Sequence, residues 1–166
     1  SVIDGKNETI KFGIPTTSLE LDQISQLKYK QYSSRQYIDS EKFPEHRERD
    51  EYDNDLNSKY FFATWNDKVI ATIRLIQDNP LPTQKAFDFI EPSYIANLPF
   101  ENRAEFGRFI ITPLDKENNK YLPRRVVMLV LFQVLLQFCV NNNIEGGYSF
   151  LKSSLYKKMK RLRMPI

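Results

Sequence analysis

A carboxylate and a guanidinium stand three residues apart in Glu105-Phe106-Gly107-Arg108-Phe109, a segment that otherwise has the apolar composition of a buried strand. Unpaired charge is costly in such a strand. Side chains of a regular strand alternate between faces, so Glu105 and Arg108 would point in opposite directions. Gly107 between them permits a β-bulge, which would turn both charges into one cleft. The segment predicts either a structural ion pair or a functional site.

The composition predicts one folded domain over residues 1–166. The chain has 166 residues, of which 41% are apolar, enough to bury a substantial core. Its single cysteine, Cys139, lies in an apolar run, which favours a core role over a nucleophile. With one cysteine no intramolecular disulfide forms, and we expect a cytoplasmic compartment.

The apolar runs of the sequence are short. The longest apolar run, Val126 to Val140, is interrupted by Gln133 and Gln137. It is shorter than the roughly 20 residues that cross a bilayer, so we expect a core helix and no transmembrane segment. The chain lacks an initiator methionine and stops after a basic helical pattern, from which we expect a piece of a longer sequence.

The charge is unevenly distributed along the chain. The net charge is +3, but the part after Glu117 has nine basic residues against one acid, so it carries +8 and the part before it −5. This asymmetry favours a polyanionic partner. Because the basic residues are not interleaved with stacking aromatics, we expect an acidic protein and not nucleic acid.

The apolar periodicity and the turn residues predict an alternation of helices and mostly antiparallel strands. The turn-prone pair Asn66-Asp67 predicts a hairpin, and Thr17 with Glu20 predicts a capped start of the first helix. We expect strands at 9–13, 60–64, 69–75, 104–112 and 148–151, and helices at 18–32, 123–141 and 153–163. The segment 40–56 is densely charged and predicts a short helix and a loop. Residues 77–100, with four prolines, predict a long connection.

Four short motifs occur in an order that resembles one enzyme family. They are Lys28-Tyr29-Lys30-Gln31-Tyr32, Asp50-Glu51-Tyr52-Asp53, Ile73-Arg74-Leu75-Ile76 followed by Pro80-Leu81-Pro82, and Glu105-Phe106-Gly107-Arg108-Phe109. Together they resemble the acyl-homoserine-lactone (autoinducer) synthases and the N-acyl amino acid synthases. The resemblance implies an α/β fold of the GNAT acyltransferase type, with a mostly antiparallel central sheet flanked by helices. The family continues past the last basic helix with further strands, which this sequence lacks.

The resemblance also implies an activity, the transfer of a fatty acyl group from an acyl carrier protein thioester to an amine. The family's polar cluster corresponds to Asp50, Asp53, Arg74, Glu105 and Arg108, its first motif supplies Lys28 and Tyr32, and Phe87 or Phe89 matches its aromatic position. Lys28, Ile38 and Gly107 depart from the lactone synthases, which act on S-adenosylmethionine. We therefore rank an N-acyl amino acid synthase first, a lactone synthase second, and a non-catalytic lipid-binding or protein-binding module third.

The reaction assigns tasks to individual residues. Glu105 is the candidate to accept the amine proton, because a carboxylate in an apolar strand is suited to general base catalysis. Arg108 or Arg74 could clamp a substrate carboxylate, or could simply pair with Asp50, Asp53 or Glu105. Backbone N–H groups freed at the bulge could stabilise the oxyanion.

An acyl chain needs apolar walls, and the reaction needs no metal. Phe106 and Phe109 of the charged strand are candidate substrate-binding residues, and Phe106, Met128, Phe132 and Phe138 are candidate walls, with core packing as the alternative for these four. The single histidine, His46, has charged neighbours and predicts a solvated side chain and no zinc site.

The donor is expected to be carried by a protein. The segment Thr112 to Leu122 contains no glycine, which disfavours the glycine-rich phosphate loop of enzymes that use coenzyme A. Basic residues instead predict a docking patch for an acidic carrier protein and its acyl-phosphopantetheine arm: Lys120, Arg124, Arg125, Lys152, Lys157 and Lys158. The alternative is a solubilising basic face.

Overall fold

Five strands and their connecting helices follow one another in the order expected from the sequence. The computed structural model describes residues 10–112, 124–151 and 153–161. The strands are β1 (Ile10–Gly13), β2 (Ser58–Trp65), β3 (Lys68–Ile76), β4 (Arg103–Ile111) and β5 (Gly146–Ser149). The α-helices are α1 (Ser18–Ser33), α2 (Pro82–Ala86), α3 (Ser93–Ala96), α4 (Arg124–Asn141) and α5 (Ser153–Arg161), and the 3₁₀ helices are η1 (Ser40–Lys42), η2 (Glu51–Asn54) and η3 (Phe100–Asn102).

The predicted hairpin forms the centre of the sheet. Its turn residues Asn66 and Asp67 have φ angles of 48° and 59°, the left-handed conformation that a two-residue type I′ turn requires. Asn and Asp tolerate this conformation better than most side chains do. The turn fixes the antiparallel register of β2 and β3.

The sheet has the order β1-β2-β3-β4-β5, in which the first four strands are antiparallel and β5 runs parallel to β4. β5 lies two residues earlier than the sequence pattern predicted, because the pattern gave no weight to the glycines at its start. A Cβ at Gly147 would lie 1.7 Å from the carbonyl oxygen of Ala104, so only glycine permits this close pairing. β5 pairs with Arg103–Phe106 of β4, and this parallel pairing does not continue beyond Phe106.

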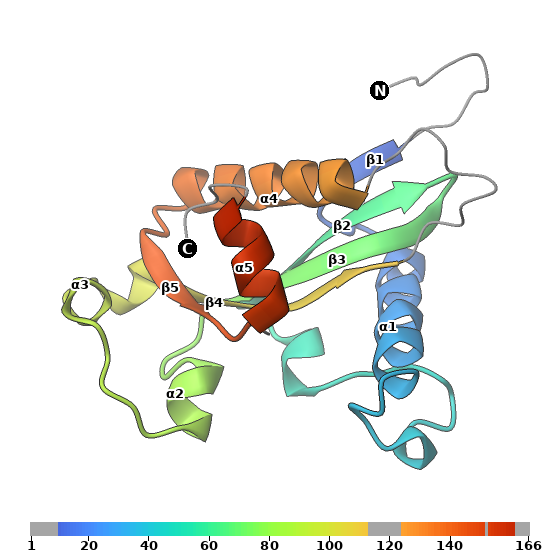
Figure 1. Ribbon diagram of the computed structural model, residues 1–166, viewed down its shortest axis with the longest axis horizontal. Coiled ribbons are helices and arrows are strands. Elements are labelled where there is room, and N and C mark those ends of the chain that lie inside the picture. Colours follow the sequence, from blue (N-terminus) through green and yellow to red (C-terminus); the bar gives the residue numbers. More distant parts are fainter. Residues whose placement is uncertain (1–9, 113–123, 152, 162–166) are drawn as a thin grey trace.

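Helices cover both faces of the sheet (Figure 1). α4 lies over one face and buries Val127, Met128 and Leu131 in a cluster with Phe61 of β2. α1 lies over the opposite face, where its apolar residues pack with alternate residues of β2 and β3. We call these the α4 face and the α1 face.

The local signals in the sequence correctly predict α1 and α4. Thr17 caps α1 and exchanges hydrogen bonds with Glu20 in a capping box. α4 is, among the described residues, the one helix long and apolar enough to span a membrane on those two criteria. Five of its residues are buried, among them Cys139 in the core as predicted, and burial raises the pKa of the Cys139 thiol to about 11.

The long connection between β3 and β4 is more ordered than predicted, because it contains α2, α3 and η3. Arg103, 5% exposed, donates to the carbonyl oxygens of Ala96 and Leu98 and pairs with Glu91. Glu91 also accepts a hydrogen bond from the hydroxyl of Tyr148 in β5. These bonds fasten the connection to the end of the sheet where β4 and β5 meet.

The packing of α4 predicts that Leu131→Ala destabilises the protein strongly. Leu131 is fully buried, and truncation of a buried leucine costs about 2–5 kcal/mol. Leu129 of the same helix is 42% exposed, and Leu129→Ala should cost less than about 1 kcal/mol. Urea denaturation of both variants measures the difference, and equal losses would contradict the assigned orientation of α4.

Candidate functional site

A β-bulge interrupts β4 at the charged motif, as the sequence predicted. Thr72 pairs with Ile110 and Arg74 with Gly107, so two residues of β4 lie opposite one residue of β3. Gly107, which the sequence identified as the residue that permits the bulge, does not have a left-handed φ, whereas Arg108 has one, of 55°. A bulky residue adopts this conformation only when its surroundings hold it there.

The bulge places the side chains of Glu105 and Arg108 on the same face of the sheet. Glu105 lies opposite Ile76 and Gly107 opposite Arg74, so both positions belong to the α1 face, and Arg108 contacts groups on that face. Glu105 and Arg108 nevertheless have separate partners. Oε2 of Glu105 accepts the backbone N–H of Thr83, at 2.6 Å, in the first turn of α2.

Six charged side chains meet on the α1 face and form what we call the charge cluster. Three are cationic and three are carboxylates: Lys28, Arg74, Arg108, Glu48, Asp50 and Asp53. They come from α1, β3, β4 and the segment around η2. Because their formal charges cancel, the cluster can be buried without an uncompensated charge.

Lys28 lies at the base of the charge cluster and is completely buried. Its Nζ contacts Asp53 at 2.7 Å, Tyr60 Oη at 2.8 Å and Glu48 at 2.9 Å. An ammonium group has three donors, and these three contacts use them all. In this arrangement Lys28 supports the residues above it, and its contact with a substrate stays a prediction.

Arg74 forms a two-pronged ion pair with Asp50, with N···O distances of 2.6 and 2.8 Å. Burial alone would raise the pKa of Asp50, but hydrogen bonds from Arg74 and Arg108 hold that pKa well below its usual range. Burial disfavours the charged form of Arg74 and would lower its pKa. The ion pair with Asp50 outweighs this effect, so the pKa of Arg74 lies above its usual value. Both groups therefore stay charged across the physiological range.

Arg108 is the most exposed cation of the charge cluster, with 32% of its side chain accessible. Its Nη2 contacts Asp50 at 2.6 Å and Glu48 at 2.9 Å, and its guanidinium lies 5.4 Å from the ring centre of Tyr32. Burial raises the pKa of Tyr32, which keeps its hydroxyl neutral. These contacts hold Arg108 in its left-handed conformation and leave part of its guanidinium open to a ligand.

Two members of the site were missed by the sequence reasoning. Glu48 is 3% exposed, although it stands in a run of charged residues that looks solvated. Tyr60 Oη accepts from Lys28 and Arg74 and donates to Asp53. A tyrosine in a strand has no local signal for such a role. Glu48 stands two residues before Asp50, and this spacing is the sequence signal that could have placed Glu48 in the same site.

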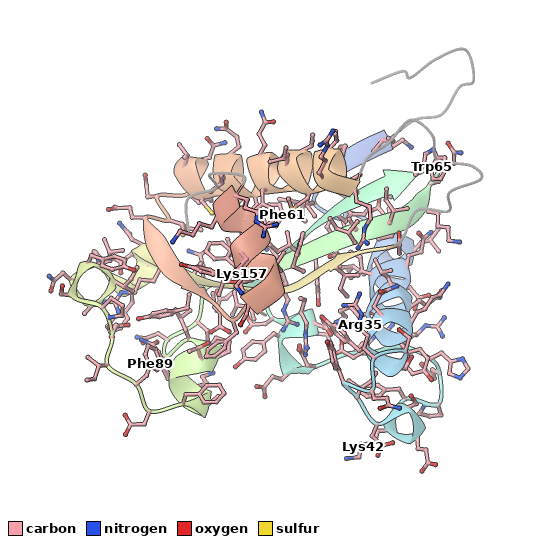
Figure 2. The ribbon with its side chains drawn as sticks, viewed as in Figure 1. Arg35, Lys42, Phe61, Trp65, Phe89 and Lys157 are labelled. Atoms are coloured by element: carbon pink, nitrogen blue, oxygen red, sulfur yellow. The ribbon has the colours of Figure 1, made fainter. Side chains whose placement is uncertain are left out.

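The predicted aromatic residues lie in two separate places. Phe106 faces Leu75, and Phe109 stacks on Phe132, so both lie on the α4 face, opposite the charge cluster. Phe89, seen beside α2 in Figure 2, packs edge-on against Tyr148 with ring centres 5.4 Å apart. Tyr148 pairs with Glu105 across β4 and β5, so Phe89 lies near the charged end of β4.

The remaining aromatic candidates belong to the core or to the surface. Phe87, 57% exposed, stacks on Phe150 just beyond β5. Met128 is 1% exposed, and Phe132 and Phe138 pack against the same core, as the core-packing alternative predicted.

The predicted docking patch is partly described. Arg124 and Arg125 are exposed at the start of α4, and Lys157 is exposed on α5 (Figure 2). Arg124 donates to the carbonyl oxygen of Ile111, which ties the helix start to the end of β4. Lys120, Lys152 and the side chain of Lys158 lie outside the described residues.

His46 lies at the surface, as expected, where its ring stacks on Tyr29 at 4.9 Å. Within residues 10–112, 124–151 and 153–161, no group of three or more His, Cys, Asp or Glu side chains is arranged to hold a metal ion.

The network around Tyr60 predicts that Tyr60→Phe weakens the fold without leaving a cavity. Loss of the hydroxyl removes an acceptor from Lys28 and Arg74 and a donor from Asp53, which should cost about 1–3 kcal/mol. Tyr52→Phe is the matched control, because the Tyr52 hydroxyl accepts a long hydrogen bond, 3.4 Å, from the exposed Lys85, and its loss should change stability by less than about 0.5 kcal/mol. Chemical denaturation measures both, and an unchanged Tyr60→Phe protein would refute the role of the hydroxyl.

The lowered pKa of Asp50 predicts acid sensitivity. A carboxyl group whose folded pKa lies below its ordinary value of 3.8 stabilises the fold above that pH, and this contribution is lost as the pH falls through the folded pKa. The free energy of unfolding of Asp50→Asn should therefore fall less steeply below pH 3.8 than that of the unmodified protein. Denaturation at a series of acidic pH values tests this, and parallel curves would contradict it.

Solved structures of acyl-transferring enzymes share this fold. The AHL synthase LasI is 17% identical with a TM-score of 0.66, and the match covers 95% of this chain and 78% of LasI. FeeM, an N-acyl amino acid synthase from uncultured soil microbes, is 16% identical with a TM-score of 0.62, over 94% of this chain and 76% of FeeM.

A third similar structure is BjaI, a CoA-dependent acyl-homoserine lactone synthase solved with SAM and isopentyl-CoA. It is 16% identical with a TM-score of 0.62, and the match covers 87% of this chain and 65% of BjaI. The chain thus spans about two thirds to three quarters of the length of these relatives. At these identities the similarity establishes the GNAT-type fold alone.

A match between the sequence and a family model identifies the family. No curated protein matches the chain. The model of one family, described as "N-acyl amino acid synthase FeeM", matches residues 23–162, which include the charge cluster, the bulge and most of the sheet. The chain therefore belongs to the N-acyl amino acid synthase FeeM family of acyltransferases.

Proposed function

We propose that this protein transfers a long-chain fatty acyl group from an acyl carrier protein thioester to the amine of an amino acid. The observation that carries the proposal is the position of Glu105 and Arg108. They lie on one face of β4, on either side of Gly107, at the point where pairing with β5 ends. A proton acceptor and a carboxylate anchor therefore flank a strand edge with unpaired backbone groups.

The acceptor would be held by charge on the α1 face. Its carboxylate would bind the accessible part of the Arg108 side chain, of which 32% is exposed. The Nε of Arg108 is itself buried, without a hydrogen-bond partner among the described residues. An arginine fork suits a carboxylate because its parallel N–H groups match the two oxygens. Asp50 and Glu48 keep Arg108 in place, so the anchor is organised before the substrate arrives.

The chemistry requires one proton acceptor and one site for the oxyanion. Glu105, through Oε1 or a bridging water, would take a proton from the acceptor ammonium or amine. The amine nitrogen then forms a bond to the thioester carbon, the C–S bond breaks, and the thiolate leaves and takes up a proton. Backbone N–H groups of β4 beyond Phe106 would donate to the carbonyl oxygen while it is negative.

The acyl chain would lie on the apolar α4 face. Phe106 and Phe109 project from β4 on that side, against the core beneath α4. This arrangement lets one strand contact a charged acceptor on one face and a hydrocarbon chain on the other.

The assignment of the acyl donor rests on the basic residues and on a sequence segment without glycine. Thr112 to Leu122 contains no glycine, and Arg125 and Lys157 are exposed at α4 and α5. These features favour an acidic carrier protein with its acyl-phosphopantetheine arm over coenzyme A. No tightly held cofactor is needed for the proposed reaction.

The test combines two acyl donors with three classes of acceptor. The full-length protein is incubated with palmitoyl-acyl carrier protein or palmitoyl-coenzyme A, and with free amino acids, S-adenosylmethionine or buffer alone. Mass spectrometry should detect an N-acyl amino acid with the carrier-protein donor. An acyl lactone formed from S-adenosylmethionine would instead make it a lactone synthase, and acyl binding without product would make it a non-catalytic module.

The proposed role of Glu105 predicts that Glu105→Gln lowers kcat by about 100-fold to 10,000-fold. The amide keeps the size of the side chain but cannot accept the proton, so binding of the acyl donor should change little. Glu101→Gln, at an exposed position in η3, is the matched control and should retain full activity. Unchanged turnover in Glu105→Gln would refute its assignment as the base.

A further inference from the structure

Gly107 is a glycine at a position of β4 where the backbone does not require one. Its φ lies outside the left-handed region, and a Cβ built on it meets nothing within 4 Å. Gly147 shows the contrasting case, because a Cβ there would collide with the backbone of β4. The fold therefore allows alanine or a larger residue at position 107.

A glycine in a strand that is not required by the backbone has a cost. It is less favourable than alanine by roughly 0.5–1 kcal/mol, because the unfolded chain gains freedom. Such glycines mark places where another group approaches the strand closely. Gly107 lies opposite Arg74 on the α1 face, so the free space above it opens among the side chains of the charge cluster and Glu105.

The proposed reaction supplies the approaching group. If the amine of the acceptor reaches Glu105 and its carboxylate binds Arg108, the carbon atom that joins them lies above the residue that separates the two on the α1 face, which is Gly107. Any side chain at position 107 would point toward that carbon, since position 107 shares the α1 face with Glu105.

We propose that Gly107 is a specificity-determining position, whose missing side chain makes room for the side chain of the acceptor. The inference rests on the proposed function and deepens it: the acceptor is an α-amino acid with a bulky side chain, such as leucine or phenylalanine. A residue with a branched side chain at position 107 would restrict the enzyme to glycine and other small acceptors.

The test compares acceptors of different size in the full-length protein. Gly107→Val should lower kcat/KM for leucine and phenylalanine by about tenfold or more relative to glycine, because the three added carbon atoms fill space in the pocket and even one methylene changes discrimination to about that extent. Gly107→Ala should shift the ratio in the same direction by less. Gly13→Val is the matched control, because Gly13 also lies in a strand, a Cβ there also meets nothing within 4 Å, and its strand is at the far edge of the sheet.

The ratio of kcat/KM for leucine to kcat/KM for glycine distinguishes a steric role of Gly107 from a structural one. An equal loss of activity with glycine and leucine in both Gly107 variants would overturn the inference, as would an unchanged ratio. If Gly107→Val does not fold, the ratio measured with Gly107→Ala decides. An unmodified enzyme that acylates no amino acid would reject the proposed function itself, whereas an active enzyme with an unaffected ratio would reject only the role of Gly107.

Discussion

Mutual neutralisation in the charge cluster is the interaction on which the rest of the site depends. Transfer of an isolated ion from water to a protein interior costs several kcal/mol, and the cluster avoids this cost because each cation contacts at least two carboxylates. The contacts also cross-link the fold. They join α1, β3 and β4 to the segment around η2, in which no residue of Glu51–Asn54 is buried.

The strained backbone of β4 is part of the same arrangement. A left-handed conformation at a non-glycine residue costs about 1–3 kcal/mol, and Arg108 adopts it at φ 55° because Glu48 and Asp50 hold its guanidinium on the α1 face. Without the bulge, strand alternation would send the side chain toward the α4 face, where the charge would meet the apolar core. The bulge and the charge cluster therefore stabilise each other.

The features that sequence analysis predicted well are those with local causes. The Asn66-Asp67 turn, the capping box at Thr17 and the apolar periodicity of α4 each depend on residues a few positions apart. The ordered motifs gave the family, which the match over residues 23–162 confirms.

The features that were missed depend on contacts between distant segments. Glu48 looks solvated until α1 and β4 bring Lys28 and Arg108 to it. The left-handed backbone of Arg108 was not predicted, because it accompanies ion pairs with Glu48 and Asp50, which a residue-type rule does not include. Glu105 lies on the same face as Arg108, but its N–H partner comes from α2, a helix in the proline-rich connection that the sequence pattern did not reveal.

The two faces of β4 impose a condition on any substrate pair. One face carries matched charges and an accessible guanidinium, and the other carries Phe106 and Phe109 against the core, so in the proposed transfer a polar acceptor and an apolar chain would lie on opposite sides of the sheet. They can meet only at an edge, because a continuous sheet separates the faces. β5 leaves β4 after Phe106, which opens that edge beside Glu105 and Gly107. The end of the β4–β5 pairing therefore sets where the reacting carbon must lie in the proposed transfer.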